Sequence, residues 1–443
     1  MSKTFRPWDV DQRWLLPPSV HELVPEGHVA HFVRDTVRES LDLSAILAEY
    51  GEERGYPPYH PAMMVALLLY GYSRGVYSSR RLAQACEERV DFMAVTAMNQ
   101  PDFRTIAEFR RRHLKALGDL FVQVLRLCRK AGLVKLGHVA LDGTKIKANA
   151  SRHKAMSYGR MREAEKRLAA EVAAWFARAV AADLEEDRAL GTDARGDEMP
   201  DWVKDKQARL ARIREAMAAL EAEAAAAPAE DGDGPGPSTG MMDHGRSKRG
   251  ADGGPPDAAQ RNFTDPDSRI LKTKDGFVQG YNAQSAVDAA AQVVVAHGLG
   301  AATTDQAQLA PMVEAIEANT GRLPRELSAD AGYCSQANLA HLAERRIMAY
   351  IATGRQKHTS AAAVGGRAPP PGGHVATMAA KLKRAGRRSR YRLRKQVVEP
   401  VFGQIKAARG FRQFSLRGLD KARGEWAMIC TVHNLLKLAN ATP

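Results

Sequence analysis

The sequence predicts an α/β protein, in which a mixed β-sheet with flanking helices follows an all-α N-terminal domain and is interrupted by a helical insertion. Residues 20–47 and 60–130 carry helical periodicity. Alternation typical of a strand appears at 137–147 and returns only after residue 262. Between these stretches, residues 155–227 consist mainly of Ala, Glu, Arg and Lys, which are strong helix formers. Because strands come first and strand/helix alternation follows, we expect a mixed sheet with helices on its faces.

Length and charge favour a multidomain protein that binds nucleic acid. The chain has 443 residues and a formal net charge of +14, which suits several domains and a partner rich in phosphate. Its cysteines, at 86, 128, 334 and 430, have no zinc-ligand spacing, so we expect reduced thiols in a cytoplasmic protein. No signal peptide is visible and the apolar run at 63–70 is too short to cross a membrane, so we expect no membrane role.

The N-terminal domain, residues 1–130, is expected to consist of short helices. Pro61 can start one helix, Ser78 can cap a second, and Asp102 can cap a third. The third helix carries basic residues on or near its polar face: Arg104, Arg110, Arg111, Arg112 and His113. This pattern suits a helix-turn-helix type of DNA-binding or dimerisation domain, and a plain helical bundle is the alternative.

The sheet is expected in residues 131–154 and 262–443, on either side of the insertion. Residues 155–227 predict a helical hairpin, and residues 228–261, rich in Pro, Gly, Asp and Ser, a flexible linker. Strands are expected at 276–288, at 292–297, before Asp330 and at 347–351, with helices at 305–320, 336–345 and 426–438. Gly332 should turn the chain after Asp330, and residues 354–373 are poor in large apolar side chains.

Asp142 has two interpretations. It lies in GHVALDGTKIKANAS, whose first half alternates as a strand does, and Asp142-Gly143 is also a turn dipeptide. Asp142 is therefore either a hairpin residue or a carboxylate at a strand end. In the second case Lys145 and Lys147 follow it closely enough to meet phosphate.

Glu399 is the only acid in the basic stretch 381–417. An apolar stripe of Val398, Val401, Phe402 and Ile405 indicates a helix here. Pro400 fits best in a first turn, so we expect Glu399 at the start of that helix. The alternative is an exposed basic helix with a single charge pair.

Asp142, Asp330 and Glu399 thus stand at the ends of expected core elements. Phosphodiester chemistry needs charge neutralisation at phosphorus, which two divalent ions about 3.5–4 Å apart can supply. Carboxylate oxygens are the hard ligands that such ions prefer. The three acids, if the fold brings them together, would meet that need.

Several motifs together resemble the DDE transposases of bacterial insertion sequences. They are LDGTKIKANAS, SADAGY and the segment from Glu399 to Lys406, preceded by PYHPAMMVALLLYGYSRGVYSSRRL and FRTIAEFRRRH. The closer match is to the group with a Tyr-Arg-Glu-Lys signature. With Glu399 and Lys406 in register with that signature, Tyr391 and Arg394 each lie one residue early.

The resemblance implies an RNase H-like catalytic domain in which Asp142, Asp330 and Glu399 hold two Mg²⁺ ions, with Mn²⁺ as a substitute. It implies binding of terminal inverted repeats and target DNA by a homodimer or larger assembly in the bacterial cytoplasm, at the nucleoid. The expected reactions are DNA strand cleavage and strand transfer. The side chains expected to grip DNA are Lys406, Arg392, Arg394, Lys395, Lys145 and Lys147. A catalytically inactive DNA-binding derivative and a nuclease on the same fold are the alternatives.

Other polar residues near these motifs are expected to be structural. Asn282 and Gln284 could be polar positioners, but we favour ordinary polar residues at a strand edge. His138 and His153 are expected as surface or core residues rather than metal ligands. His433 and Asn434, in the expected closing helix, are also expected to be structural.

Overall fold

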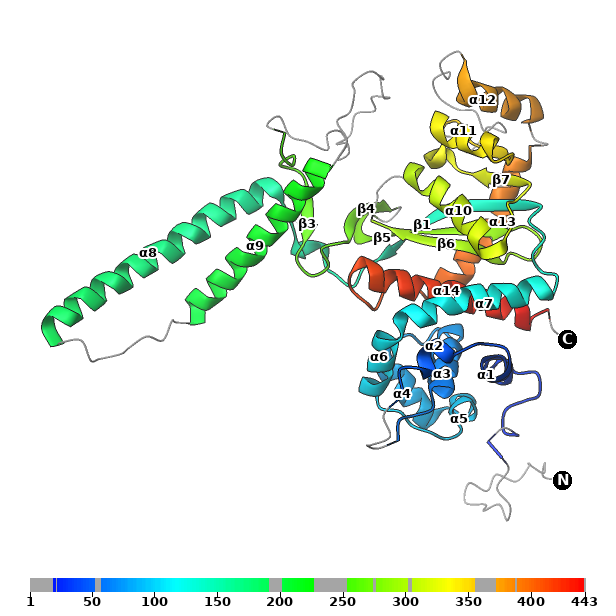
Figure 1. Ribbon diagram of the computed structural model, residues 1–443, viewed down its shortest axis with the longest axis horizontal. Helices are drawn as coiled ribbons and strands as arrows, with labels where there is room; N and C mark the ends of the chain where they lie inside the picture. Colours follow the sequence, from blue (N-terminus) through cyan, green and yellow to red (C-terminus); the bar gives the residue numbers. More distant parts are fainter. Residues whose placement is uncertain are drawn as a thin grey trace, which may run out of the picture.

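The computed structural model describes residues 19–20, 22–51, 57–190, 201–226, 253–273, 276–301, 305–354, 372–386 and 389–441, with the backbone alone for 179–190 and 201. Most of the predicted linker, residues 228–252, and most of the 354–373 stretch lie outside the described residues. Figure 1 shows a group of N-terminal helices, a sheet with its own helices, and a long helical arm.

The predicted helical N-terminal region is confirmed. Its helices are α1 (Val29–Glu39), α2 (Ser44–Leu47), α3 (Pro61–Ser73), α4 (Ser79–Glu88), α5 (Val90–Thr96), α6 (Phe103–Arg112) and α7 (Leu114–Lys130). Pro61 begins α3, and the Asp102 carboxylate caps α6 by accepting a hydrogen bond from the Arg104 amide at 2.8 Å. The short helix α5 and the separate helix α7 have no counterparts among the three helices that we expected at 60–130.

The expected basic face of α6 is wrong for two of its residues. Arg110 is only 6% exposed and donates to the Tyr72 hydroxyl, the Tyr77 carbonyl and the Ser79 hydroxyl. His113, 1% exposed, lies between the rings of Tyr50 and Phe109. Both side chains face inward because oxygens and rings of neighbouring elements surround them.

The two exposed arginines at the end of α6 are held by acids. Arg111 pairs with Glu108, and Arg112 pairs with Glu49 at 2.8 Å. The end of α6 is therefore largely neutralised within the protein itself.

The predicted mixed sheet is also confirmed. Its strands are β1 (His138–Lys147), β4 (Arg269–Thr273), β5 (Gly276–Asp288), β6 (Val294–Gly300), β7 (Glu326–Ala329) and β8 (Met348–Ile351). β5 pairs antiparallel with β1 on one side and with β4 and β6 along successive parts of the other. β1, β7 and β8 run parallel. The order is thus β6–β5–β1–β7–β8, with β4 extending the β5 edge.

Helices flank this sheet: α10 (Leu309–Thr320), α11 (Gln336–Glu344), α12 (Gly373–Ala385), α13 (Leu393–Gly403) and α14 (Leu419–Ala439). Short 3₁₀ turns precede α10 (η2, Gln306–Gln308) and follow β7 (η3, Ala331–Tyr333), and a π-helical turn (η6, Gln404–Ala408) extends α13. α14 packs on β6 and lies beside α7 (Figure 1). One continuous hydrophobic core therefore runs from the N-terminal helices into the sheet.

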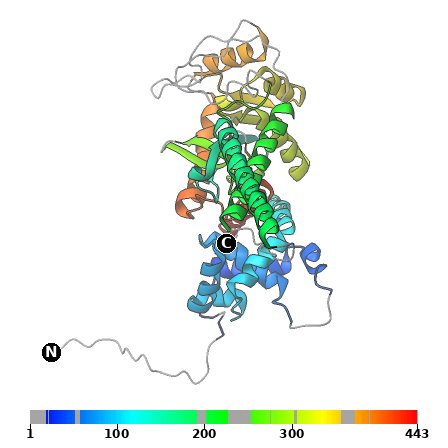
Figure 2. The same cartoon turned by 90° about the vertical axis from the view of Figure 1, so that its left-hand side faces the viewer.

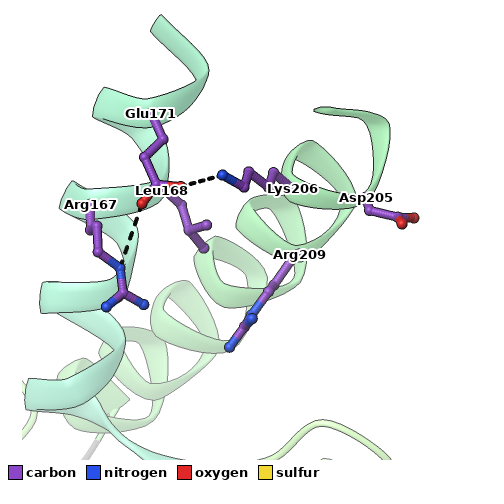
Figure 3. Close-up of a pocket in the computed structure, with 6 residues that line it drawn as sticks. All are labelled: Arg167, Leu168, Glu171, Asp205, Lys206 and Arg209. Atoms are coloured by element: carbon purple, nitrogen blue, oxygen red, sulfur yellow. Dashed lines mark hydrogen bonds and ion pairs between the residues drawn. The ribbon is translucent and has the colours of Figure 1, made fainter. Parts of the chain in front are cut away.

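The insertion forms an arm of two antiparallel helices, α8 (Tyr158–Leu190) and α9 (Asp201–Ala226), which points toward the viewer in Figure 2. At its base β2 (Ala155–Ser157) pairs with β3 (Gln260–Asn262). Its helices have a core of their own: Met161, Leu168, Leu210, Ile213, Ala216 and Leu220. A pocket of about 370 Å³ opens between them, where Glu171 pairs with Lys206 at 2.5 Å and with Arg167 at 3.9 Å (Figure 3). Such exposed pairs contribute little stability.

Two further expectations concern cysteines and membranes. All four cysteines are free thiols, and three of them are buried. Within the described ranges, no helix combines the length and apolarity that crossing a bilayer requires.

Candidate functional site

Asp142 lies inside strand β1, so both of our interpretations of its position are wrong. It pairs with Ser285 of β5, and the antiparallel pairing continues to Lys147 opposite Gly280. This long ladder leaves no room for a hairpin at Asp142-Gly143. On its other side, β1 pairs with β7 only as far as Ala140, so the strand edge at Asp142 is open toward the end of β7.

Asp330 follows β7 directly, as predicted. The last pair between the parallel strands is Ala140 with Ser328, so Asp142 and Asp330 each come two residues later, at the same level. The Asp330 carboxylate accepts a hydrogen bond from the Gly332 amide at 2.8 Å, which caps η3. The parallel register therefore brings the first two predicted acids to one place at the sheet.

Glu399 lies in the middle of α13, and the expected helix start is wrong. Pro400 stands inside the helix, where it has no N–H for the carbonyl of Gln396. The Gln292 side chain donates to that carbonyl instead, at 3.0 Å. This bond from outside the helix removes the reason for placing Pro400 in a first turn. The predicted apolar stripe of α13 is buried, whereas the Glu399 side chain is 54% exposed.

Arg394 connects the three predicted acids. Its guanidinium donates to Asp142 and lies 3.9 Å from the Glu399 carboxylate. Burial opposes its charge, but Asp142, Tyr391, Asp330 and Glu399 together raise the pKa of Arg394. The Tyr391 ring centre is 5.9 Å from the guanidinium. Tyr391 and Arg394 each lie one residue earlier than the signature places them, yet both are close to the three predicted acids.

The two aspartates resist ionisation. Burial, and then the nearby charges of Asp330 and Asp305, raise the pKa of Asp142 to about 7, although Arg394 acts in the opposite direction. Burial likewise raises the pKa of Asp330. Buried carboxylates that are close together favour a bound cation, because a cation offsets both the burial and the mutual repulsion.

The described residues contain no ready-made metal centre. No group of three or more His, Cys, Asp or Glu side chains among them has the geometry to hold an ion, and Asp142 faces Arg394 instead. Pockets of about 370 and 990 Å³ lie elsewhere, in the arm and among the N-terminal helices, and none of the three acids lines either pocket.

Asp305 is a carboxylate of this region that the sequence analysis missed. It precedes η2, and its Oδ1 accepts hydrogen bonds from Asn282 at 2.6 Å and Gln284 at 2.8 Å. The Tyr333 hydroxyl donates to the Gln284 side-chain oxygen. Asn282 and Gln284 are 4% and 0% exposed in β5, an interior strand, so our preference for strand-edge residues is wrong. The sequence did contain a signal: Asn282 and Gln284 are two residues apart, which places both side chains on the same face of a strand.

The basic residues predicted to grip DNA differ in their surroundings. Lys406 donates to the Thr144 hydroxyl and the Lys145 carbonyl, both at 2.8 Å, and burial lowers its pKa. Lys145, half-buried, donates to the Lys272 carbonyl at 2.6 Å. Apart from Arg394, which is described above, the other residues predicted to bind DNA are exposed: Arg392, Lys395 and Lys147.

The histidines near the motifs lie in structural contacts or at the surface. His138 bonds to Glu326 at 3.1 Å and to Ser328 at 2.9 Å. His433 bonds to the Gln292 carbonyl at 2.9 Å, and His153 is exposed. Asn434 exchanges hydrogen bonds with the backbone of Val294. These contacts agree with the structural roles that we expected.

Two family models match the chain. Residues 18–112 match a transposase domain (DUF772), and residues 372–439 match a transposase DDE domain. The first match covers α1 to α6, and the second covers Arg394, Glu399 and Lys406. Searches among curated proteins and among solved structures gave no match.

Proposed function

We propose that this chain, which belongs to the DDE transposases of insertion sequences, binds the terminal inverted repeats of its element, cleaves their strands and transfers them to target DNA. Transposases act on DNA, and DDE transposases use divalent metal ions. The observation that carries the proposal is the gathering of the three acids: Arg394 contacts Asp142 and lies 3.9 Å from Glu399, and the register of β1 and β7 brings Asp330 level with Asp142. These residues come from β1, the end of β7 and α13, so only the folded sheet unites them.

The donor set suits a divalent cation such as Mg²⁺ or Mn²⁺. Asp142, Asp330 and Glu399 would hold it, because carboxylate oxygens are hard ligands. When bound, two such ions would activate a water molecule and offset charge at the scissile phosphate. The positive charge now beside Asp142 belongs to Arg394, so this side chain must release Asp142 for the carboxylates to share an ion. Because both aspartates are buried, the site requires a positive charge in both states: from Arg394 when no ion is bound, and from the divalent ion when Arg394 has left.

DNA would lie against the basic residues around the acids. Arg392, Lys395 and Lys147 are exposed and are suited to phosphates. Arg394, once it leaves Asp142, can pair with a phosphate through two parallel hydrogen bonds. Lys406 fixes η6 to β1 through Thr144 and Lys145, and from there it would approach the transposon end. Lys145 would contribute beside it.

The strand order supports an RNase H-like catalytic domain formed by residues 131–154 and 262–443. Antiparallel β6, β5 and β1 continue into parallel β7 and β8, and the first acid lies on the central strand. In this assignment residues 1–130 form the DNA-binding or dimerisation domain and 155–227 the inserted hairpin. The linker expected at 228–261 is wrong for its last two residues, which begin strand β3. Synapsis of two element ends implies at least a homodimer, working at the bacterial nucleoid.

A cleavage and joining assay tests the proposal. End DNA with a labelled strand is incubated with protein and Mg²⁺, and a plasmid serves as target. We expect cleavage at the element end and labelled plasmid product, both abolished by EDTA and by Glu399→Gln. Glu344→Gln, which changes an exposed acid of α11, is the matched control and should behave as wild type. Binding without cleavage would indicate an inactive derivative, and cleavage without joining would indicate a nuclease.

A further inference from the structure

Asp305 is held beside the acid site by hydrogen bonds from buried side chains. Asn282 and Gln284 both donate to its Oδ1, and the Tyr333 hydroxyl holds Gln284 in that orientation. Asn282, Gln284 and Tyr333 are at most 4% exposed. The Asp305 carboxylate is thus fixed by buried neutral donors, which bind it without cancelling its charge.

Asp305 spans the space between the elements that carry Asp142 and Asp330. A β-carbon added at Gly143, next to Asp142, would stand 2.9 Å from Asp305 Oδ1. A β-carbon added at Gly332 would stand 3.1 Å from Asp305 Oδ2 and 3.0 Å from Asp330 Oδ1. Glycine at both positions leaves the room that this carboxylate occupies.

The Asp305 carboxylate lies close to the predicted metal ligands Asp142 and Asp330. Within the described part of the chain, no Lys, Arg or His forms an ion pair with Asp305. Its Oδ1 approaches Gly143, next to Asp142, and its Oδ2 approaches Gly332, whose amide donates to Asp330. A negative charge this close favours a divalent cation at the same carboxylates, because the attraction acts over several ångströms at low dielectric.

We propose that Asp305 is a positioning residue of the cation site: fixed by Asn282 and Gln284, its charge strengthens the binding of a divalent ion by Asp142 and Asp330. This inference rests on the proposed function and extends it to a fourth carboxylate. Asp305 acts through the two aspartates and not as a ligand.

The test separates the charge of Asp305 from its hydrogen bonds. Mn²⁺ binding to the full-length protein without DNA is measured by electron paramagnetic resonance, which reports free Mn²⁺. Asp305→Asn keeps an oxygen that accepts from both amides and loses the charge, so we expect a dissociation constant at least about tenfold higher with an unchanged melting temperature. Asp267→Asn, at a half-buried acid that caps Leu419 of α14, is the matched control and should bind as wild type.

A second neutral variant, Asp305→Ser, covers the case that Asp305→Asn does not fold, and the same loss of affinity is expected. Wild-type affinity in either folded variant would overturn the inference, as would the absence of Mn²⁺ binding by the wild type. The cleavage assay, run in parallel, distinguishes the two proposals. A wild type that binds Mn²⁺ without cleaving end DNA contradicts the proposed function alone. Cleavage by a wild type whose Mn²⁺ affinity Asp305→Asn leaves unchanged contradicts only the role of Asp305.

Discussion

The guanidinium of Arg394 donates to the carboxylate of Asp142, a residue 252 positions earlier in the chain. Arg394 comes from α13 and Asp142 from β1, so this contact fixes the helix against the centre of the sheet. The same guanidinium lies 3.9 Å from Glu399. Arg394 is therefore the counter-ion of the acid site in the protein without bound ions.

Arg394 should compete with divalent ions for Asp142. We expect Arg394→Gln to bind Mn²⁺ about tenfold more tightly than wild type in the absence of DNA, because the carboxylate no longer has to exchange a partner. The measurement is a titration followed by electron paramagnetic resonance. Lys395→Gln removes the same charge from an exposed neighbour and should leave the affinity nearly unchanged. Weaker Mn²⁺ binding by Arg394→Gln would show that the arginine assists the ion instead.

End DNA should raise the Mn²⁺ affinity of the wild type. If a phosphate draws Arg394 away from Asp142, DNA and metal favour the same state, and each must strengthen the binding of the other. In Arg394→Gln this coupling should be lost. Mn²⁺ titrations of both proteins with and without end DNA measure how much DNA raises the Mn²⁺ affinity. An equal increase in wild type and in Arg394→Gln would contradict the transfer of Arg394 from Asp142 to a phosphate.

Arg110 should be a stability residue and not a DNA contact. Its three hydrogen bonds join α6 to Tyr72, Tyr77 and Ser79. Arg110→Met leaves buried oxygens without donors, so we expect a loss of about 2–4 kcal/mol in the free energy of unfolding. Urea denaturation measures this. Arg111→Met, at a 64% exposed side chain, should change it by less than about 0.5 kcal/mol. Equal losses would mean that Arg110 is not held as described.

His433 should make the fold sensitive to acid. Burial, and then Arg409, lower the pKa of His433 to about 3, whereas an unfolded histidine binds a proton near pH 6.5. Between these values the unfolded chain binds the proton and the folded chain does not, so stability is lost as the pH falls. The stability of wild type relative to His433→Gln should therefore decrease by about 1 kcal/mol per pH unit below pH 6.5. Urea denaturation at several pH values measures the difference, and a constant difference would contradict the buried neutral ring.

Local patterns predicted most of the elements. The polar/apolar alternation around 276–288 and the strand ending before Asp330 correspond to β5 and β7. The helix expected at 305–320 corresponds to α10, which ends at Gly321 in the left-handed conformation. These features depend on residues adjacent in the chain, which is why sequence alone indicates them.

Long-range contacts explain the errors. Asp142-Gly143 has turn chemistry, but pairing with β5 across the insertion keeps it in a strand. Pro400 lacks a donor, but Gln292, 104 residues before Gln396, donates to the Gln396 carbonyl that Pro400 leaves without a partner. Asp305 has no local motif, and only Asn282 and Gln284 on a neighbouring strand mark it. These partners cannot be identified from residues that are adjacent in the chain.

The central claim is that Asp142, Asp330 and Glu399 share one cation site, and Fe²⁺-directed backbone cleavage tests it most directly. Fe²⁺ takes the place of Mg²⁺, and peroxide with ascorbate then generates radicals that cut the chain close to the bound ion. The account predicts cuts near residues 142, 330 and 399 together, suppressed by excess Mg²⁺ and weakened in Asp142→Asn. Mg²⁺-sensitive cuts that spare two of these three positions would contradict it.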